Sequence, residues 1–158
     1  MKDTPVIEGA ADASGLRIAL VVSAYHGAIT GALRDGALDA LGEAGADTAA
    51  AVTVIDAPGA FEIPFAARCA AASGRFDAVV CLGCIVRGET PHFDVLASAV
   101  CHAIAAASQS TNVPITFGVL TTNTMAEAEV RSRGNDNKGR EAALAAVQLA
   151  NVQRQLLW

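Results

Sequence analysis

Short, almost wholly apolar runs alternate with longer helix-like segments along this sequence, and that order constrains the fold more than any other feature. A run without polar residues at alternate positions predicts a strand buried on both faces, as in a parallel sheet covered by helices. We expect four such strands, at residues 16–23, 52–56, 78–84 and 114–122. The fold class is therefore α/β, with a four-stranded parallel sheet in a single domain.

The segments between the strands carry signals typical of helix ends. Helices are predicted at residues 28–44, 64–74, 91–109, 125–132 and 138–155. Gly45 suits the cap after the first helix, and Pro64 suits the first turn of the second. Thr90 and Pro91 suit the N-cap and the first position of the third helix. Loops are expected at residues 85–89 and 133–137.

Hydrophobic residues make up 53% of the chain and charged residues 17%. Charged residues or glycines interrupt every apolar run before the roughly 18 residues that a membrane span requires. The surplus of apolar side chains therefore predicts burial between subunits, in a homo-oligomer. Residues 1–15 lack the features of a signal or transit peptide, so we expect a flexible N-terminal arm, a domain at 16–158 and a cytoplasmic protein.

The formal net charge is −5 and the basic residues are scattered singly, so neither a nucleic acid nor a membrane is an expected partner. Of the cysteines, only Cys81 and Cys84 form a CxxC pair. They lie inside a predicted strand, where alternation directs them to opposite faces. No second pair stands at ligand spacing, so we expect buried structural thiols and no metal site.

Polar and aromatic residues follow each predicted strand, at the edge of the sheet where open parallel sheets bind ligands. The most informative segment is GETPHFD, at residues 88–94. It places backbone amides, the Thr90 hydroxyl and the His92 imidazole at one helix N-terminus, whose partial positive charge suits a phosphate group. The same field favours the neutral imidazole, which can accept a proton. The alternative is that Thr90 only caps the helix and His92 is an ordinary surface residue.

Two basic residues beyond the fourth strand are further candidates for an anion site. Arg131 ends a short predicted helix, and its planar guanidinium suits phosphate oxygens. The alternative is a solvated pair with Glu127, four residues earlier on the same helix. Lys138 is a weaker candidate, since a lysine at a helix start is usually solvated.

Aromatic rings and one carboxylate complete the candidate residues. In APGAFEIP, at residues 57–64, Glu62 can accept hydrogen bonds from a polyhydroxyl ligand while Phe61 packs. A tight turn with a glutamate that complements the helix dipole is the alternative. Tyr25 can stack on a heterocycle or only cover the end of the sheet. Strand alternation directs Phe117 toward the core, so a ligand role for it requires the site of a neighbouring subunit.

Four separated segments together resemble the lumazine synthase family. They are PGAFEIP at 58–64, LGCIVRGETPHFD at 82–94, FGVLTTNT at 117–124 and NKG at 137–139. The resemblance implies a flavodoxin-like three-layer α/β/α sandwich and homopentamers with active sites between subunits. In some members the pentamers associate into decamers or icosahedral shells. The loop at 133–137 is about one residue shorter here than in some shell-forming members, which leaves shell formation open.

The resemblance also implies a reaction of riboflavin biosynthesis. 5-Amino-6-(D-ribitylamino)uracil condenses with 3,4-dihydroxy-2-butanone 4-phosphate to give 6,7-dimethyl-8-ribityllumazine, phosphate and water, and the family requires no cofactor and no metal. His92 matches the proton-transfer histidine. The family's phosphate-binding residues correspond to Glu89, Thr90, Arg131 and Lys138. The pyrimidine and ribityl site matches Tyr25, Ala60, Phe61, Glu62, Cys84, Ile85 and Val86, with Phe117 contributed by a neighbouring subunit.

Three positions depart from the family's commonest pattern. Tyr25 stands where phenylalanine or tryptophan is usual, and His26 stands where asparagine is frequent, which leaves its role open. Glu89 brings a carboxylate to the phosphate site, which is compatible only if its backbone N–H makes the contact. The rival interpretations are a riboflavin synthase of the same fold, which needs no phosphate site, and an idle flavin-binding or shell-forming protein. The predicted phosphate and proton-transfer residues argue against both.

Overall fold

A computed structural model describes residues 3–157 of the chain. Residues 1–2 and 158, at the ends of the predicted arm and domain, lie outside the described residues. The elements in order are β1 (Ile18–Ser23), α1 (Gly27–Glu43), α2 (Thr48–Ala51), β2 (Val52–Ala57), η1 (Ala60–Glu62), α3 (Ile63–Ala72), β3 (Ala78–Val86), α4 (His92–Thr111), β4 (Ile115–Thr122), α5 (Met125–Arg131), η2 (Gly134–Asp136) and α6 (Lys138–Leu156).

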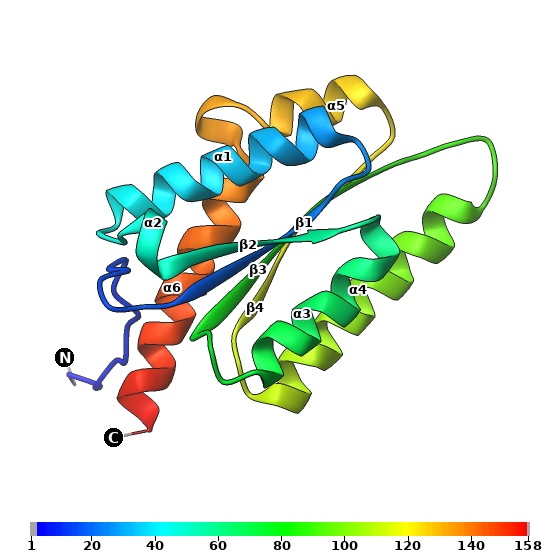
Figure 1. Cartoon of the computed structure of the whole chain (residues 1–158). Coiled ribbons are helices and arrows are strands. Elements are labelled where there is room, and N and C mark those ends of the chain that lie inside the picture. The colour runs from blue at the N-terminus through cyan, green and yellow to red at the C-terminus, as the bar shows by residue number, and fades with distance from the viewer. Residues whose placement is uncertain (1–2, 158) are drawn as a thin grey trace.

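The described strands are all parallel and form one sheet in the order β2-β1-β3-β4. Helices α1 and α6 cover one face of this sheet, and α3 and α4 cover the other (Figure 1). The predicted three-layer α/β/α class is therefore confirmed. Within residues 3–157, no helix is long and apolar enough to cross a membrane.

Several element ends differ from the prediction by a few residues. β3 continues to Val86, because β4 pairs with it as far as Val86↔Thr122, so the loop expected from residue 85 begins at Arg87. α4 begins at His92 instead of residue 91 and runs to Thr111, where Asn112 takes a left-handed backbone (φ 56°) and ends it. The short helix α2, capped by the Asp47 carboxylate, was not predicted.

Burial differs between the centre and the edges of the sheet. Every residue of β1 is buried, as its apolar run predicts. β2 is an edge strand in which Thr53, Val54 and Asp56 are exposed, so the expectation of a strand buried on both faces is wrong there. β4 is the opposite edge, and Phe117 on it is 42% exposed. The prediction that Phe117 faces the core is therefore wrong, because β4 is an edge strand of the described sheet and the Phe117 ring stays partly open to solvent.

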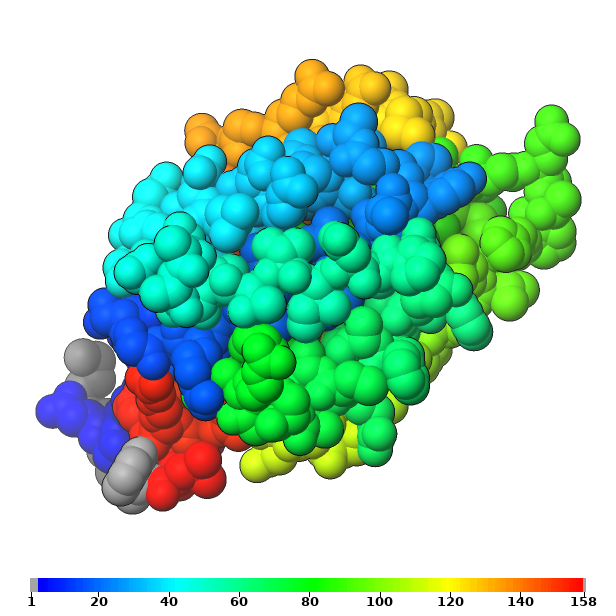
Figure 2. Space-filling model, viewed as in Figure 1, coloured from blue at the N-terminus to red at the C-terminus, as the bar shows by residue number. Residues whose placement is uncertain are grey.

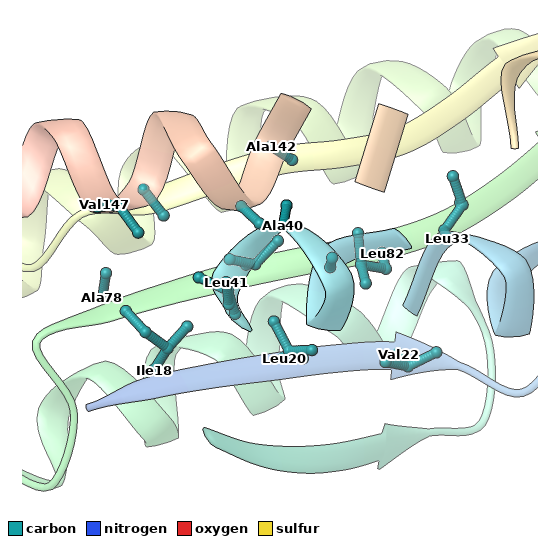
Figure 3. Packing of buried hydrophobic residues seen from close by; sticks show 14 of the residues in the cluster. Ile18, Leu20, Val22, Leu33, Ala40, Leu41, Ala78, Leu82, Ala142 and Val147 are labelled. Carbon is teal, nitrogen blue, oxygen red and sulfur yellow. The ribbon is translucent and has the colours of Figure 1, made fainter. Parts of the chain in front are cut away.

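Alternate residues of the central strands supply two cores. Ile18, Leu20 and Val22 pack with Leu33 of α1 and Val147 of α6 on one face (Figure 3). A second apolar cluster lies under α3 and α4 on the other face. Cys81 belongs to this second cluster and Cys84 to the first, so the prediction that the CxxC cysteines point to opposite faces is confirmed.

The N-terminal residues that the structure describes lie along α6. The Asn151 side chain donates to the carbonyls of Ala10 (2.8 Å) and Asp12 (2.9 Å), and Gln155 donates to the carbonyl of Glu8 (2.6 Å). Ala13 is fully buried in the core under α1 and α6. These contacts do not test the flexibility of the arm, which stays a prediction.

Asn137 joins three elements on the α1–α6 face. It is 6% exposed, and its Nδ2 donates to the carbonyls of Ala32 in α1 (3.0 Å) and Ser132 after α5 (2.8 Å). Its Oδ1 accepts from Gly139 N (2.8 Å) and Arg140 N, which caps α6. The close approach of α6 to α1 at this point requires glycine at position 139, because a Cβ there would lie 2.0 Å from the Leu33 carbonyl oxygen.

Replacing Asn137 should therefore loosen the end of the molecule that carries Arg131 and Lys138. We expect Asn137→Ala to lower the free energy of unfolding by about 2–3 kcal/mol, from the lost cap, the lost hydrogen bond to Ala32 and the buried Ser132 carbonyl left without this donor. Urea unfolding at one fixed protein concentration measures the change. Asn135→Ala, at a neighbouring exposed position, is the matched control and should leave stability within about 0.5 kcal/mol. Equal effects of the two substitutions would contradict this role.

Candidate active site

A cavity of about 590 Å³ opens at the carboxyl ends of β1 and β3. Its walls come from the loop after β1, from η1, from the end of β3 and from α4. The lining residues are Tyr25, His26, Gly59, Ala60, Phe61, Glu62, Cys84, Ile85, Val86, His92, Val95, Leu96, Ala99 and Met125. The structure thus brings together His92 and all residues predicted for the pyrimidine and ribityl site except Phe117.

The turn from β1 into α1 holds an aromatic pair at the mouth of this cavity. His26 has a left-handed backbone (φ 56°, ψ 51°), which is uncommon for a residue with a side chain. Its carbonyl accepts the first helical hydrogen bonds, from Ile29 N (2.9 Å) and Thr30 N (3.0 Å). The Tyr25 and His26 rings meet edge to face, with their centroids 4.5 Å apart. Tyr25 is 66% exposed, which leaves its ring available to a planar ligand.

The segment between β2 and α3 supplies the carboxylate. Gly59 is extended, and a Cβ there would lie 3.0 Å from Glu62 Oε2. Glycine therefore leaves the room in which the Glu62 carboxylate sits. The carboxylate is exposed on the single turn η1 and can accept hydrogen bonds from hydroxyl groups.

The end of β3 forms the floor of the cavity. Cys84 is only 2% exposed and packs in the core under α1 and α6, so its thiol lies away from the helix α4. Burial raises the pKa of the Cys84 thiol to about 11 and that of Cys81 to about 12. Both thiols are therefore neutral near pH 7 and behave as apolar wall and core groups.

His92 is the first residue of α4, on the same helix face as Val95, Leu96 and Ala99 of the cavity wall. The Thr90 hydroxyl accepts a long hydrogen bond from His92 N (3.4 Å), although Pro91, not Thr90, stands immediately before the helix. Gly88, Glu89 and Thr90 are exposed. The connection between β3 and α4 projects from the body of the molecule (Figure 2).

A second hollow, of about 450 Å³, lies beside the edge strand β4. Residues 116–122 line it together with Arg131 and Lys138, so it collects Phe117 with two of the predicted phosphate residues. Arg131 donates from Nη1 to the Glu127 carbonyl (3.0 Å), not to the Glu127 carboxylate that the pairing alternative requires. Lys138 pairs with Glu141 (2.8 Å).

The two hollows divide the predicted site within one chain. The sequence interpretation places Arg131 with Gly88, Glu89 and Thr90 in one half of a pocket that a second subunit completes. Among the residues that the structure describes, His92 and Arg131 instead line separate hollows, and Arg131 lies beside Phe117 along β4. The residues that the sequence interpretation did not assign are His26, Gly59, Met125 and the α4 wall. Helical spacing from His92, at the third, fourth and seventh following residues, could have identified that wall.

These features define an open-sheet α/β protein whose ligand cavity lies at the carboxyl ends of its strands. The model of the 6,7-dimethyl-8-ribityllumazine synthase family matches residues 15–154. Two similar relatives are the 6,7-dimethyl-8-ribityllumazine synthases of Chlorobaculum tepidum and Chlorobaculum parvum. Each is 46% identical over 151 residues, covering 95% of this chain and 97% and 96% of the relatives. The chain therefore belongs to the 6,7-dimethyl-8-ribityllumazine synthase family.

The thiol environments can be tested by alkylation. At pH 8 we expect iodoacetamide to react more slowly in the folded protein than in urea, by roughly 100-fold at Cys84 and roughly 1000-fold at Cys81, since raised pKa values leave little thiolate. The Cys84 rate should rise with pH up to about 11. Peptide mass spectrometry separates the four cysteines. The exposed Cys69 is the internal control, and equal protection of Cys69 and Cys84 would contradict the assignment.

Proposed function

We propose that the chain performs its family's reaction in a pocket that a neighbouring subunit completes. As a family member the chain is a transferase of riboflavin biosynthesis. It condenses 5-amino-6-(D-ribitylamino)uracil with 3,4-dihydroxy-2-butanone 4-phosphate to give 6,7-dimethyl-8-ribityllumazine, phosphate and water. The observation that carries the proposal is the cavity, which collects Tyr25, Glu62 and His92 at one edge of the sheet.

The cavity residues suit the steps of this condensation. Imine formation, phosphate elimination, ring closure and dehydration each move protons and require two oriented substrates more than a strong nucleophile. In the proposal, His92 exchanges those protons. Tyr25 stacks on the pyrimidine, Glu62 accepts hydrogen bonds from the ribityl hydroxyls, and the backbone at the end of β3 contacts the pyrimidine edge.

The phosphate group is assigned to the boundary between two subunits. The backbone N–H groups of Glu89 and Thr90 stand just before α4, where the helix dipole favours an anion. Arg131 and Lys138 come from the neighbouring subunit with Phe117, because these three residues share the hollow along β4. Glu89 is exposed, which leaves its carboxylate free to turn toward solvent.

Exposed apolar residues near the cavity support assembly. Phe61 is 66% exposed, Phe65 on α3 is 77% exposed and Val95 on α4 is 68% exposed. Large apolar side chains grouped on one side of a small domain are typical of a contact with another subunit. A homopentamer and a cytoplasmic location are part of the proposal.

The activity itself is directly measurable. Purified protein mixed with both substrates and a chelator should form a green-fluorescent lumazine. Replacing the proton-exchanging imidazole in His92→Gln should lower kcat by roughly 100-fold or more. Circular dichroism and light scattering establish that both proteins are folded and assembled. Folded wild-type protein that makes no lumazine would refute the proposed function.

A mixing experiment tests whether the pocket spans two subunits. His92→Gln and Arg131→Ala each inactivate one half of the proposed site. Unfolding and refolding them together at equal amounts should restore about a quarter of the wild-type activity, since half of the subunits supply an intact His92 and half of their neighbours an intact Arg131. Each variant refolded alone is the control. If the two residues act within one chain, the mixture stays as inactive as the separate variants.

A further inference from the structure

Arg87 connects three elements at the edge of the sheet where the proposed site lies. Its Nη1 and Nη2 donate to the two carboxylate oxygens of Asp94 in α4, each at 3.2 Å. Its Nε donates to Asn123 Oδ1 after β4 (3.0 Å), and its backbone N donates to the Thr122 carbonyl (2.9 Å). The guanidinium also lies over the Phe93 ring, with Cζ 4.4 Å from the ring centroid.

The pair of Arg87 with Asp94 ties together the two ends of the loop between β3 and α4. Arg87 stands directly before Gly88 and Asp94 lies in the first turn of α4, so their bidentate pair joins the two ends of the segment that contains Glu89, Thr90 and His92. Residues 88–92 are exposed and have no core packing to fix them. Phe93 is the first buried residue of α4, and the guanidinium covers its ring.

A further set of hydrogen bonds continues from Arg87 to α5. Asn123 N donates to Glu127 Oε2 (2.8 Å), and Glu127 N donates to the Thr124 hydroxyl (3.2 Å). The Glu127 carbonyl accepts from Arg131 Nη1 (3.0 Å). One continuous polar path therefore links the helix that begins with His92 to the helix that ends with Arg131.

The exposure of the Arg87–Asp94 pair indicates that it contributes to geometry more than to stability. The Arg87 side chain is 43% exposed and that of Asp94 61% exposed, and exposed ion pairs add at most about 1 kcal/mol to stability. A bidentate arginine–carboxylate pair still fixes geometry well. The Asp94 carboxylate also offsets the positive charge of Arg87, so the pair holds little net attraction for a phosphate.

We propose that Arg87 is a positioning residue, which holds the 88–90 backbone and His92 in the geometry that the phosphate-bearing substrate requires. The inference rests on the proposed function of this loop. Arg87 acts through Asp94, Asn123 and Phe93 and does not itself touch the substrate.

Kinetics of Arg87→Gln, Asp94→Asn and the double variant test the proposal. Each single substitution should lower kcat/KM for the phosphate-bearing substrate by roughly 10- to 100-fold, because small displacements of reacting groups cost rate. The double variant should be no worse than the poorer single variant, since both remove one interaction. Affinity for the pyrimidine substrate alone, measured by calorimetry, should stay within about two-fold, because its cavity walls are not part of this pair. A general loss of structure would weaken both substrates.

Asp94→Asn also separates positioning from direct binding. If Arg87 bound the phosphate itself, removing the neighbouring negative charge would strengthen use of that substrate, and Arg87→Lys would retain most of the activity. Either result would overturn the proposal. Under the proposal Arg87→Lys stays impaired, because an ammonium group cannot hold Asp94 and Asn123 together.

The chain offers a matched control. Arg17 binds Asp77 through its backbone N (2.7 Å) and its guanidinium (3.4 Å), in another exposed pair, at the amino ends of β1 and β3. Arg17→Gln should leave both kinetic constants unchanged. Wild-type kinetics in Arg87→Gln would overturn the positioning role, whereas absence of lumazine formation by the wild type would refute the proposed function instead.

Discussion

The parallel pairing of β1 with β3, from Ile18↔Ala78 to Val22↔Leu82, is the contact on which the rest of the structure depends. These strands lie at the centre of the sheet, and their alternate residues supply both apolar cores. Because they run in the same direction and in register, both end at one edge of the sheet. The Tyr25 loop and the end of β3 therefore face each other across one cavity, although they are far apart in the sequence.

The central strands bring site residues together, whereas the edge strand β4 keeps others apart from them. β4 has a neighbour on one side only, so Phe117 reaches the surface and forms a hollow with Arg131 and Lys138. His92, proposed for proton exchange, and the side chains of Arg131 and Lys138, proposed for phosphate binding, thus line separate hollows of one chain. In the proposed assembly, the β4 edge of one copy faces the cavity of another and completes its pocket. In the proposal, such a contact also covers Val95, which lines the cavity and is exposed in the single chain.

The sequence predicted the features that depend on local pattern. The apolar runs of β1 and β3 identified the sheet, and the order of strands and helices identified the layers. The sequence pattern did not reveal that β2 and Phe117 are exposed, because burial depends on which strands occupy the edges. It also gave no signal for the left-handed backbone of His26, which stands between β1 and α1. The contacts of Arg87 join residues from three elements, and such contacts follow from tertiary structure alone.

The proposed site is held in place in two physically different ways. The cavity floor belongs to β3, which is hydrogen-bonded on both sides and buried, so its position is as stable as the fold. The segment 88–92 is exposed and is tied by an ion pair, a hydrogen bond to Asn123 and one aromatic contact. Weakly packed segments open at lower free energy than core strands. The proposed pocket must hold a planar substrate still while it admits the phosphate-bearing substrate and releases the phosphate eliminated from it, and a fixed floor with a weakly packed rim suits that task.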